Sequence, residues 1–254
     1  MAETKANDAS RNNVVVKVGM VGDAQVGKTT LMVKYVENKF DEEYIMTLGV
    51  NFMEKTITLR NTEITFSIWD LGGQREFLSM LPLVCNDAVA IFFMFDLSRK
   101  STLNSVKEWY RQVRGLNRNA YAFLVGTKYD LYTTMPAEEQ RDIDKQARKF
   151  AKAMHAPLIF TSASHSINVQ KARRYKKIER MFKVVLSRVF DLRCNLEEIS
   201  GAGEPLLLFK EEGDAAATKA KTGSSPSLEA GAGSASAEGA TAGAALKGST
   251  SAAK

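Results

Sequence analysis

The residues with the clearest chemistry are Gly22, Gly27, Lys28 and Thr29, which have the spacing of a P-loop, G-x-x-x-x-G-K-[ST]. Glycines lack a Cβ atom, so successive backbone N–H groups can curl around a phosphate. Lys28 supplies a mobile cation for the β- and γ-phosphates, and the Thr29 hydroxyl is a ligand for Mg²⁺. We therefore predict a nucleotide phosphate site that includes Asp23, Ala24, Gln25, Val26, Gly27, Lys28, Thr29 and Thr30. The alternative interpretation is a glycine turn followed by a surface lysine.

A second group of polar residues lies in the stretch WDLGGQREF, residues 69–77, directly after an apolar run. Asp70 is placed to hold Mg²⁺ through water, as a Walker-B carboxylate does. The Gly73 backbone N–H can meet a γ-phosphate, and Gln74 can orient an attacking water. We therefore predict Gln74 and Lys28 as catalytic residues and Asp70 as part of the metal site. Taken alone, Asp70 would instead be a strand-end residue that caps a turn.

The third group selects the base. A carboxylate at Asp130 can accept hydrogen bonds from guanine N1–H and from the 2-amino group, whereas adenine presents no such pair of donors. The aliphatic stem of Lys128 can lie over the ring, and Thr127 begins the same motif. A backbone N–H from Ser162 or Ala163, after the next apolar run, can meet guanine O6. The sequence therefore predicts GTP and GDP as ligands in preference to ATP.

Behind these motifs, apolar runs alternate with amphipathic stretches. This pattern predicts an α/β fold of the P-loop NTPase type, with a doubly wound, mostly parallel sheet and helices on both faces. Ligands of such sheets bind beyond the carboxyl ends of the strands, where each motif falls. The predicted strands are residues 14–20, 50–59, 64–69, 88–95, 121–125 and 158–160, and the predicted helices are residues 28–38, 101–116, 136–154 and 181–192.

Composition divides the 254 residues into three parts. Residues 201–254 are dominated by Ala, Gly, Ser and Thr, and we predict a disordered tail because such a segment buries too little apolar area to offset its ordering entropy. Residues 1–12 form a polar N-terminal arm that we also expect to be disordered. Residues 13–200 are then one domain with a single core.

The net charge of +6 is local. Residues 171–183 carry seven basic side chains and one acidic side chain, Glu179, so the rest of the chain sums to zero. Without a broad basic face we expect no nucleic-acid partner, and the basic segment is either solvated or docks a partner protein.

Two cysteines, Cys85 and Cys194, indicate a reducing compartment and no disulfide framework. No signal peptide or transmembrane run is visible. Ala2 stands where N-myristoylation needs glycine, and the C-terminus carries no cysteine for prenylation. We therefore expect a cytoplasmic protein without a direct lipid anchor.

Taken together, residues 14–192 resemble a Ras-superfamily small GTPase. Phe40 follows Lys28 by twelve positions, where the superfamily places an aromatic ring against guanine. Thr47 comes seven positions later, and the resemblance implies that it binds Mg²⁺, senses the γ-phosphate and joins Lys28 and Gln74 in catalysis. The implied metal ligands are thus Thr29, Thr47 and Asp70. More narrowly, WDLGGQREF, MLPLVCNDAVAIFFMFDLS and GTKYD resemble the fungal septum-promoting GTPases of the septation and mitotic-exit pathways.

This resemblance implies a monomeric GTP/GDP switch with slow hydrolysis, on the order of 10⁻⁴ s⁻¹, that a partner raises about 10³- to 10⁵-fold. The implied partners are a two-component activating complex with a TBC-type catalytic subunit, an effector protein kinase and a scaffold at the spindle pole body. The implied effector surface is residues 42–52 with the segment around Gln74. Two alternatives stay open: a Rab-like trafficking GTPase, which the missing lipid anchor disfavours, and a nucleotide-binding scaffold whose hydrolysis is incidental.

Three departures from the superfamily pattern lead to further expectations. Thr127 replaces the usual asparagine, so we expect looser contacts with the P-loop, and Ser164 replaces a lysine that supports the base. Residues 172–180, ARRYKKIER, separate Val169 from Phe182 by nine extra positions. Nine residues turn a helix by about 900°, half a turn out of phase, so a continuous helix cannot bury both apolar side chains. We expect the insertion to bulge as a loop or a projecting basic helix; a splice variant or gene-model error is the alternative.

Overall fold

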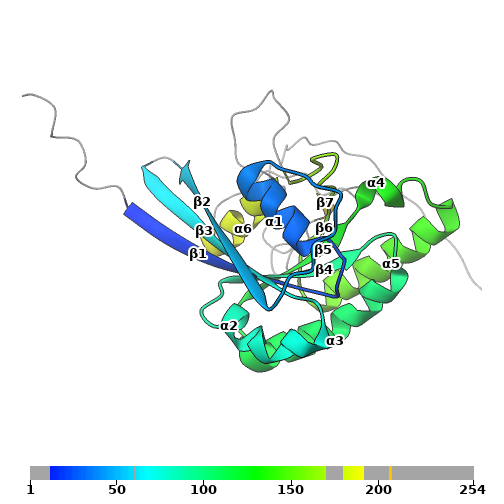
Figure 1. Ribbon diagram of the computed structural model, residues 1–254, viewed down its shortest axis with the longest axis horizontal. Coiled ribbons are helices and arrows are strands. Elements are labelled where there is room, and N and C mark those ends of the chain that lie inside the picture. The colour runs from blue at the N-terminus through cyan, green and yellow to red at the C-terminus, as the bar shows by residue number, and fades with distance from the viewer. Residues whose placement is uncertain (1–11, 60, 170–179, 192–205, 208–254) are drawn as a thin grey trace, which may run out of the picture. The chain divides into compact units, whose positions relative to one another are not determined.

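The computed structural model describes residues 12–59, 61–169, 180–191 and 206–207. Seven strands form one sheet in the order β2-β3-β1-β4-β5-β6-β7 (Figure 1). The central pairs are parallel, and only β2 with β3 and β6 with β7 are antiparallel. The strands are β1 (Asn12–Val21), β2 (Val50–Leu59), β3 (Thr62–Leu71), β4 (Ala90–Asp96), β5 (Tyr121–Thr127), β6 (Leu158–Phe160) and β7 (Leu206–Leu207). The predicted doubly wound, mostly parallel sheet is confirmed.

Helices cover both faces of this sheet. α1 (Lys28–Glu37) and α6 (Arg180–Val189) pack on one face, and their apolar side chains join one core cluster with β1 and β3. α2 (Leu81–Cys85), α3 (Lys100–Leu116) and α5 (Ala137–Ala153) pack on the other face and share the second cluster (Figure 1). A 3₁₀ helix, η1 (Arg75–Met80), leads into α2, and the short α4 (Tyr129–Tyr132) follows β5. All seven residues of β4 are buried, as a strand covered on both faces requires.

Helix α6 is anchored by Phe182. Its ring stacks on Tyr35 with centroids 3.5 Å apart and meets Phe66 edge-on at 4.9 Å. Val169, on the other side of the insertion, is also fully buried in the same cluster. The backbone N–H of Met181 donates to the Asn168 carbonyl at 3.4 Å, so the two ends of the insertion lie side by side. Residues 170–179 lie outside the described residues, so the predicted loop or projecting helix stays a prediction.

The structure differs from the sequence prediction in several short elements. α2, α4 and η1 were not expected, because segments of four to six residues show no periodicity. Leu206–Leu207 were assigned to a disordered tail, yet they pair with β6 as strand β7 and cover its outer edge. The rest of the predicted tail and the N-terminal arm to residue 11 lie outside the described residues. Among the helices that the structure describes, none combines the length and apolar character needed to cross a bilayer.

The position of Met181 leads to a deletion experiment. Asn168 and Met181 are thirteen positions apart, and removing residues 172–180 leaves four, the spacing at which a helical N–H meets a carbonyl. We expect this variant to fold, to bind nucleotide and to melt within a few degrees of the full chain. Removing residues 170–180 instead leaves two positions, half a helical turn out of phase, so Phe182 leaves the core. That control should melt about 10 °C lower or fail to fold; equal melting of the two variants would contradict this account of the insertion.

Candidate nucleotide-binding site

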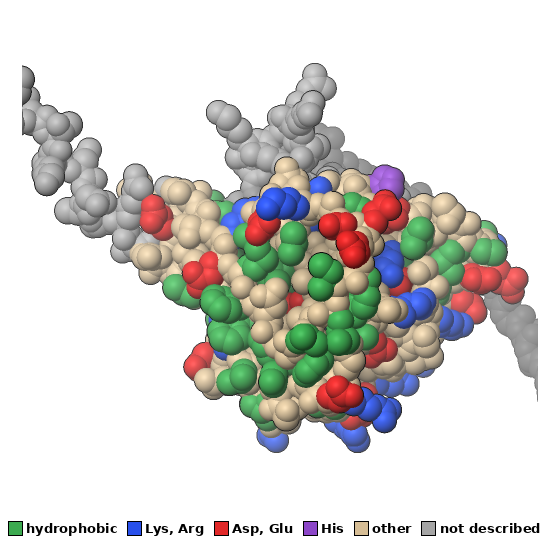
Figure 2. Space-filling model, in the orientation of Figure 1, with side chains coloured by type: hydrophobic (Ala, Val, Ile, Leu, Met, Phe, Trp, Pro, Cys, Tyr) green, Lys and Arg blue, Asp and Glu red, His purple; other side chains and the backbone are tan. Residues whose placement is uncertain are grey.

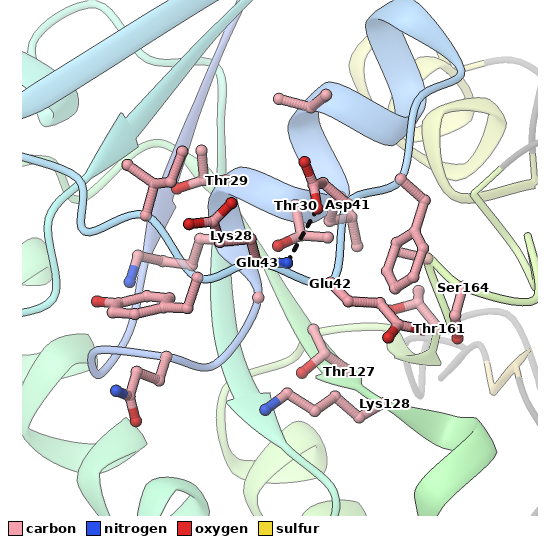
Figure 3. Close-up of a pocket in the computed structure, with 18 of the residues that line it drawn as sticks. Lys28, Thr29, Thr30, Asp41, Glu42, Glu43, Thr127, Lys128, Thr161 and Ser164 are labelled. Atoms are coloured by element: carbon pink, nitrogen blue, oxygen red, sulfur yellow. Dashed lines mark hydrogen bonds between the residues drawn. The ribbon is translucent and has the colours of Figure 1, made fainter.

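One pocket of about 760 Å³ lies at the carboxyl edge of the central strands. Figure 3 shows Lys28 and Thr29 on one side of it and Thr127 and Lys128 on another. The predicted site residues that line the pocket are Ala24, Gln25, Gly27, Lys28, Thr29, Thr30, Phe40, Thr47, Gly73, Gln74, Thr127, Lys128, Asp130 and Ala163. The predicted residues that do not line it are Asp23, Val26, Asp70 and Ser162. Each of them is hydrogen-bonded to a residue that does line it.

The P-loop follows β1 and ends at the first turn of α1. The Lys28 ammonium donates to the carbonyls of Gly22 and Asp23, at 2.9 Å each. Burial lowers the pKa of Lys28, against the opposing influence of Asp70 and Asp23. From the sequence, we attribute the glycine at position 22 to the close approach of a phosphate. In the structure, a Cβ at this position would instead lie 2.3 Å from the carbonyl oxygen of Met94 in β4. This glycine is therefore required by the packing of the loop on the sheet.

The three predicted metal ligands meet in one place. The hydroxyl oxygens of Thr29 and Thr47 are 2.6 Å apart, and the Thr29 hydroxyl donates to Asp70 Oδ2. Asp70 is fully buried, and its Oδ1 has no hydrogen-bond partner among the described residues. Burial raises the pKa of Asp70 to about 6, against the lowering influence of Lys28 and the two hydroxyls. Two hydroxyls and a carboxylate with an unused oxygen are hard ligands that fit Mg²⁺, and no cluster of three His, Cys, Asp or Glu side chains in the described residues offers another metal site.

Gly73 brings the segment after β3 into direct contact with the P-loop. A Cβ at Gly73 would lie 2.3 Å from the Ala24 nitrogen and from the Asp23 carbonyl carbon. Any side chain at position 73 would therefore push the two segments apart. Gln74, the next residue, lines the pocket at this junction, as its predicted catalytic role requires.

At the base end, Ser162 and Ala163 have different roles. The Ser162 hydroxyl donates to Asp130 Oδ1 at 2.6 Å, which fixes the carboxylate predicted to recognise guanine. The Ser162 N–H donates to the Ile167 carbonyl at 3.2 Å, so of the two N–H groups predicted to be able to meet guanine O6, this one is already engaged. Ala163, which lines the pocket, is the member of the pair placed to make that contact.

Thr127 braces the P-loop, contrary to expectation. Its hydroxyl lies 2.5 Å from the Val26 carbonyl oxygen and 3.0 Å from the Phe95 carbonyl oxygen, and its single proton is shared between these two acceptors. The expected loosening is therefore wrong, because a buried threonine hydroxyl reaches both the loop and the end of β4.

Ser164, which replaces the usual lysine, belongs to a chain of hydroxyls. Its Oγ lies 3.0 Å from the Ser162 Oγ and 3.0 Å from His165 Nδ1, while the His165 N–H donates to the Ser162 Oγ at 3.1 Å. Ser164 and His165 both line the pocket. His165 was not predicted as a site residue. The one feature of the sequence that could have indicated it is its position directly after Ser164.

Comparison with known proteins identifies the family. The sequence profile of the Ras family matches residues 17–182. This chain belongs to the Ras family. Over 202 residues it is 66% identical to Septum-promoting GTP-binding protein 1 of Schizosaccharomyces pombe, a match that covers 80% of this chain and 98% of that protein. It is 30% identical to Ras-related protein SEC4 of Saccharomyces cerevisiae, over 62% of this chain and 71% of the relative. It is 31% identical to Ras-related protein Rab-27B of Bos taurus, over 69% and 81%.

Guanine nucleotide binding and GTP hydrolysis are the general activities of the Ras family, and the protein is a small GTPase. In this Ras-family GTPase the motifs of the phosphate and base sites stand in the order that the fold requires, on the loops after β1, β3, β5 and β6. Its resemblance to the septation GTPases is confirmed by the 66% identity.

The buried carboxyl of Asp70 generates one prediction. We expect Asp70→Asn to stabilise the nucleotide-free GTPase at neutral pH. Because the pKa of Asp70 is raised to about 6, its ionised form destabilises the folded state above that pH, on the order of 3 kcal/mol, and a neutral amide removes this cost. The gain in melting temperature should be full above pH 6 and should vanish toward pH 4.

The matched control is Asp142→Asn, because this carboxylate is exposed on α5 and pairs only with Lys100 among the described residues. It should leave the melting temperature unchanged at both pH values. A melting gain in Asp70→Asn that is equally large at pH 4 would contradict the role of ionisation.

Thr127 generates a second prediction. Thr127→Val leaves the buried carbonyls of Val26 and Phe95 without their hydroxyl donor, which costs about 1–3 kcal/mol. We expect GDP to dissociate about tenfold faster from this variant, as measured with a fluorescent GDP analogue. Thr127→Ser keeps the hydroxyl and should release GDP at the wild-type rate. Release from Thr127→Val at the wild-type rate would show that the brace does not hold the P-loop.

Proposed function

We propose that this GTPase is a magnesium-dependent switch between GTP- and GDP-bound forms and that the switch promotes septation. The observation that carries the proposal is the contact of Thr47 with Thr29, because it joins the loop before β2 to the P-loop at the predicted metal ligands. A loop tied to a metal ion and to a γ-phosphate is ordered while that phosphate is present and is released after its loss.

The pocket residues divide the chemistry among them. Lys28 balances charge on the β- and γ-phosphates. Thr29, Thr47 and Asp70 are the residues that would hold Mg²⁺, which would supply further positive charge there. Gln74 orients a water molecule whose oxygen bonds the γ-phosphorus as the bond to the β–γ bridging oxygen breaks. The products are GDP and inorganic phosphate.

We infer that hydrolysis depends on a partner. Among the described residues no arginine lines the pocket, so we infer that the arginine that speeds phosphoryl transfer comes from a partner protein. A two-component activating complex with a TBC-type catalytic subunit would supply it and would raise a rate on the order of 10⁻⁴ s⁻¹ by about 10³- to 10⁵-fold. Single-turnover hydrolysis with and without this complex tests the proposal, and turnover within seconds by the protein alone would refute it.

The cellular role rests on the comparisons. Identity to the septum-promoting protein is 66%, against 30% to SEC4 and 31% to Rab-27B. We propose that the GTP form recruits an effector protein kinase, at a scaffold of the spindle pole body, and that this kinase cascade triggers septation and mitotic exit. The protein would be a cytoplasmic monomer that is recruited to the spindle pole body.

Two alternatives make different predictions. The Rab relatives favour a trafficking GTPase, which would follow membrane compartments in a tagged-protein experiment during mitosis and would not mark the spindle pole body. A scaffold with incidental hydrolysis would leave single-turnover GTP cleavage unchanged when the activating complex is added.

An exposed apolar surface beside the pocket is the proposed effector site. Figure 2 shows hydrophobic side chains gathered on the face that carries β2 and α2. The side chains of Ile45 and Leu48 are 76% and 72% exposed, and Phe52 and Leu83 are also exposed. The Phe52 ring stacks on Trp69 with centroids 5.6 Å apart, which presents a flat apolar area to a partner.

We expect the double variant Ile45→Ala/Leu48→Ala to hydrolyse GTP normally and to lose at least tenfold in affinity for the effector kinase. Expressed in Schizosaccharomyces pombe cells that lack their septum-promoting protein, wild type should restore septa and the double variant should not. Val15→Ala, at a 61% exposed residue of β1, is the control and should behave as wild type. If the double variant restored septation, the effector site would not be the surface that contains Ile45 and Leu48.

A further inference from the structure

An arginine behind the P-loop reaches its backbone. Arg99, in the turn between β4 and α3, donates from Nη2 to the Ala24 carbonyl at 3.1 Å. Its Nε donates to Asp96 Oδ2 at 2.9 Å, and the Asp96 side chain is fully buried. Lys128 contacts the same carboxylate oxygen at 2.8 Å. Arg99 is therefore held by a buried anion that it shares with a residue of the base site.

The geometry of the peptide bond sets the direction of the neighbouring N–H. In a trans peptide unit the carbonyl and the following N–H point in opposite directions. The Ala24 carbonyl points out toward Arg99, so the N–H of Gln25 points the other way, and both residues line the pocket. Gln25 has a φ of 62°, the left-handed conformation of a backbone nest that binds anions.

A cation on a carbonyl oxygen polarises the whole peptide unit and strengthens the hydrogen bond that its N–H donates. In GTP hydrolysis, negative charge develops on the phosphate oxygens that face the P-loop, and fixed donors aimed at such charge are among the largest catalytic contributions. Arg99 thus acts on the reaction without touching the nucleotide.

We propose that Arg99 is a positioning residue for GTP hydrolysis, which orients and polarises the Ala24–Gln25 peptide from behind the P-loop. The same segment is fixed on both sides of that peptide. The Trp109 indole N–H donates to Asp23 Oδ1 at 2.9 Å, and Gly73 packs against the Ala24 nitrogen. Movement of the Ala24–Gln25 peptide would therefore also displace Gly73 and with it the next residue, Gln74.

The test is single-turnover hydrolysis of pre-bound GTP, because nucleotide affinity does not enter that rate. Arg99→Met keeps the length of the side chain and removes the charge, and we expect hydrolysis about three- to tenfold slower. Arg99→Lys keeps a cation and should regain at least half of the lost rate. Arg111→Met, on the exposed side of α3, is the control and should match wild type.

A spectroscopic measurement separates this role from a general loss of structure. In GDP-bound protein labelled with ¹⁵N-glutamine, the Gln25 amide proton should shift upfield in Arg99→Met and stay in place in Arg111→Met. The proposal rests on the GTPase activity of the chain, and the wild-type rate in the same assay tests that activity separately. A wild-type rate in Arg99→Met, an unmoved Gln25 amide, or Arg99→Lys as slow as Arg99→Met would each overturn the proposal.

Discussion

The P-loop can bind a phosphate only if its carbonyl oxygens are satisfied from outside, because the N–H groups that curl inward leave those oxygens facing the protein. A buried carbonyl without a donor costs about 1–3 kcal/mol, so each outward oxygen constrains the sequence around it. The donors come from α1, from the turn before α3 and from the end of β5. They are Lys28 Nζ for Gly22 and Asp23, Arg99 Nη2 for Ala24, Thr127 Oγ1 for Val26 and the Leu31 N–H for Gly27.

The sheet register brings these donors together. Asp96 and Thr127 are partners at the ends of β4 and β5, so the anion that holds Arg99 and the hydroxyl that holds Val26 are neighbours. A slip of one residue would turn every side chain of a strand to its opposite face. In β4, where both faces are buried, a slip would place a side chain of different size at each close-packed position, so the packing of this strand also fixes a contact at the phosphate end. Because hydrogen bonds to Lys128 and Ser98 outweigh the cost of burial, the pKa of Asp96 is lowered and the carboxylate stays ionised.

The features that could be predicted from the sequence are those that depend on residues close together in the chain. Strand and helix periodicity yielded the fold class, and the motif spacing yielded much of the lining of the pocket. Phe40 and Thr47, which also line it, came from the resemblance to the Ras superfamily. The bracing contacts were missed because they join residues far apart in the chain. Arg99 and Ala24 are 75 positions apart, and Thr127 and Val26 are 101 apart. No local pattern reports such a pair, and a polar residue after a strand is as compatible with solvent as with a buried carbonyl.

The P-loop is held more firmly on the side of its outward carbonyl oxygens, here called its rear, than on the side that faces Thr47 and Gly73, here called its front. This difference is what a nucleotide-dependent switch requires. Its rear is fixed by charged or buried donors from three elements, whereas Thr47 reaches its front through one hydroxyl and Gly73 through close backbone packing. The loop that carries Thr47 is mostly exposed and has few buried side chains to hold it. Segments with few buried contacts open at low free-energy cost. In the proposed switch, a γ-phosphate would shift the population of the segments that carry Thr47 and Gly73 by contacts made only in the GTP form. The donors on the other side of the P-loop would keep the phosphate site formed in both forms.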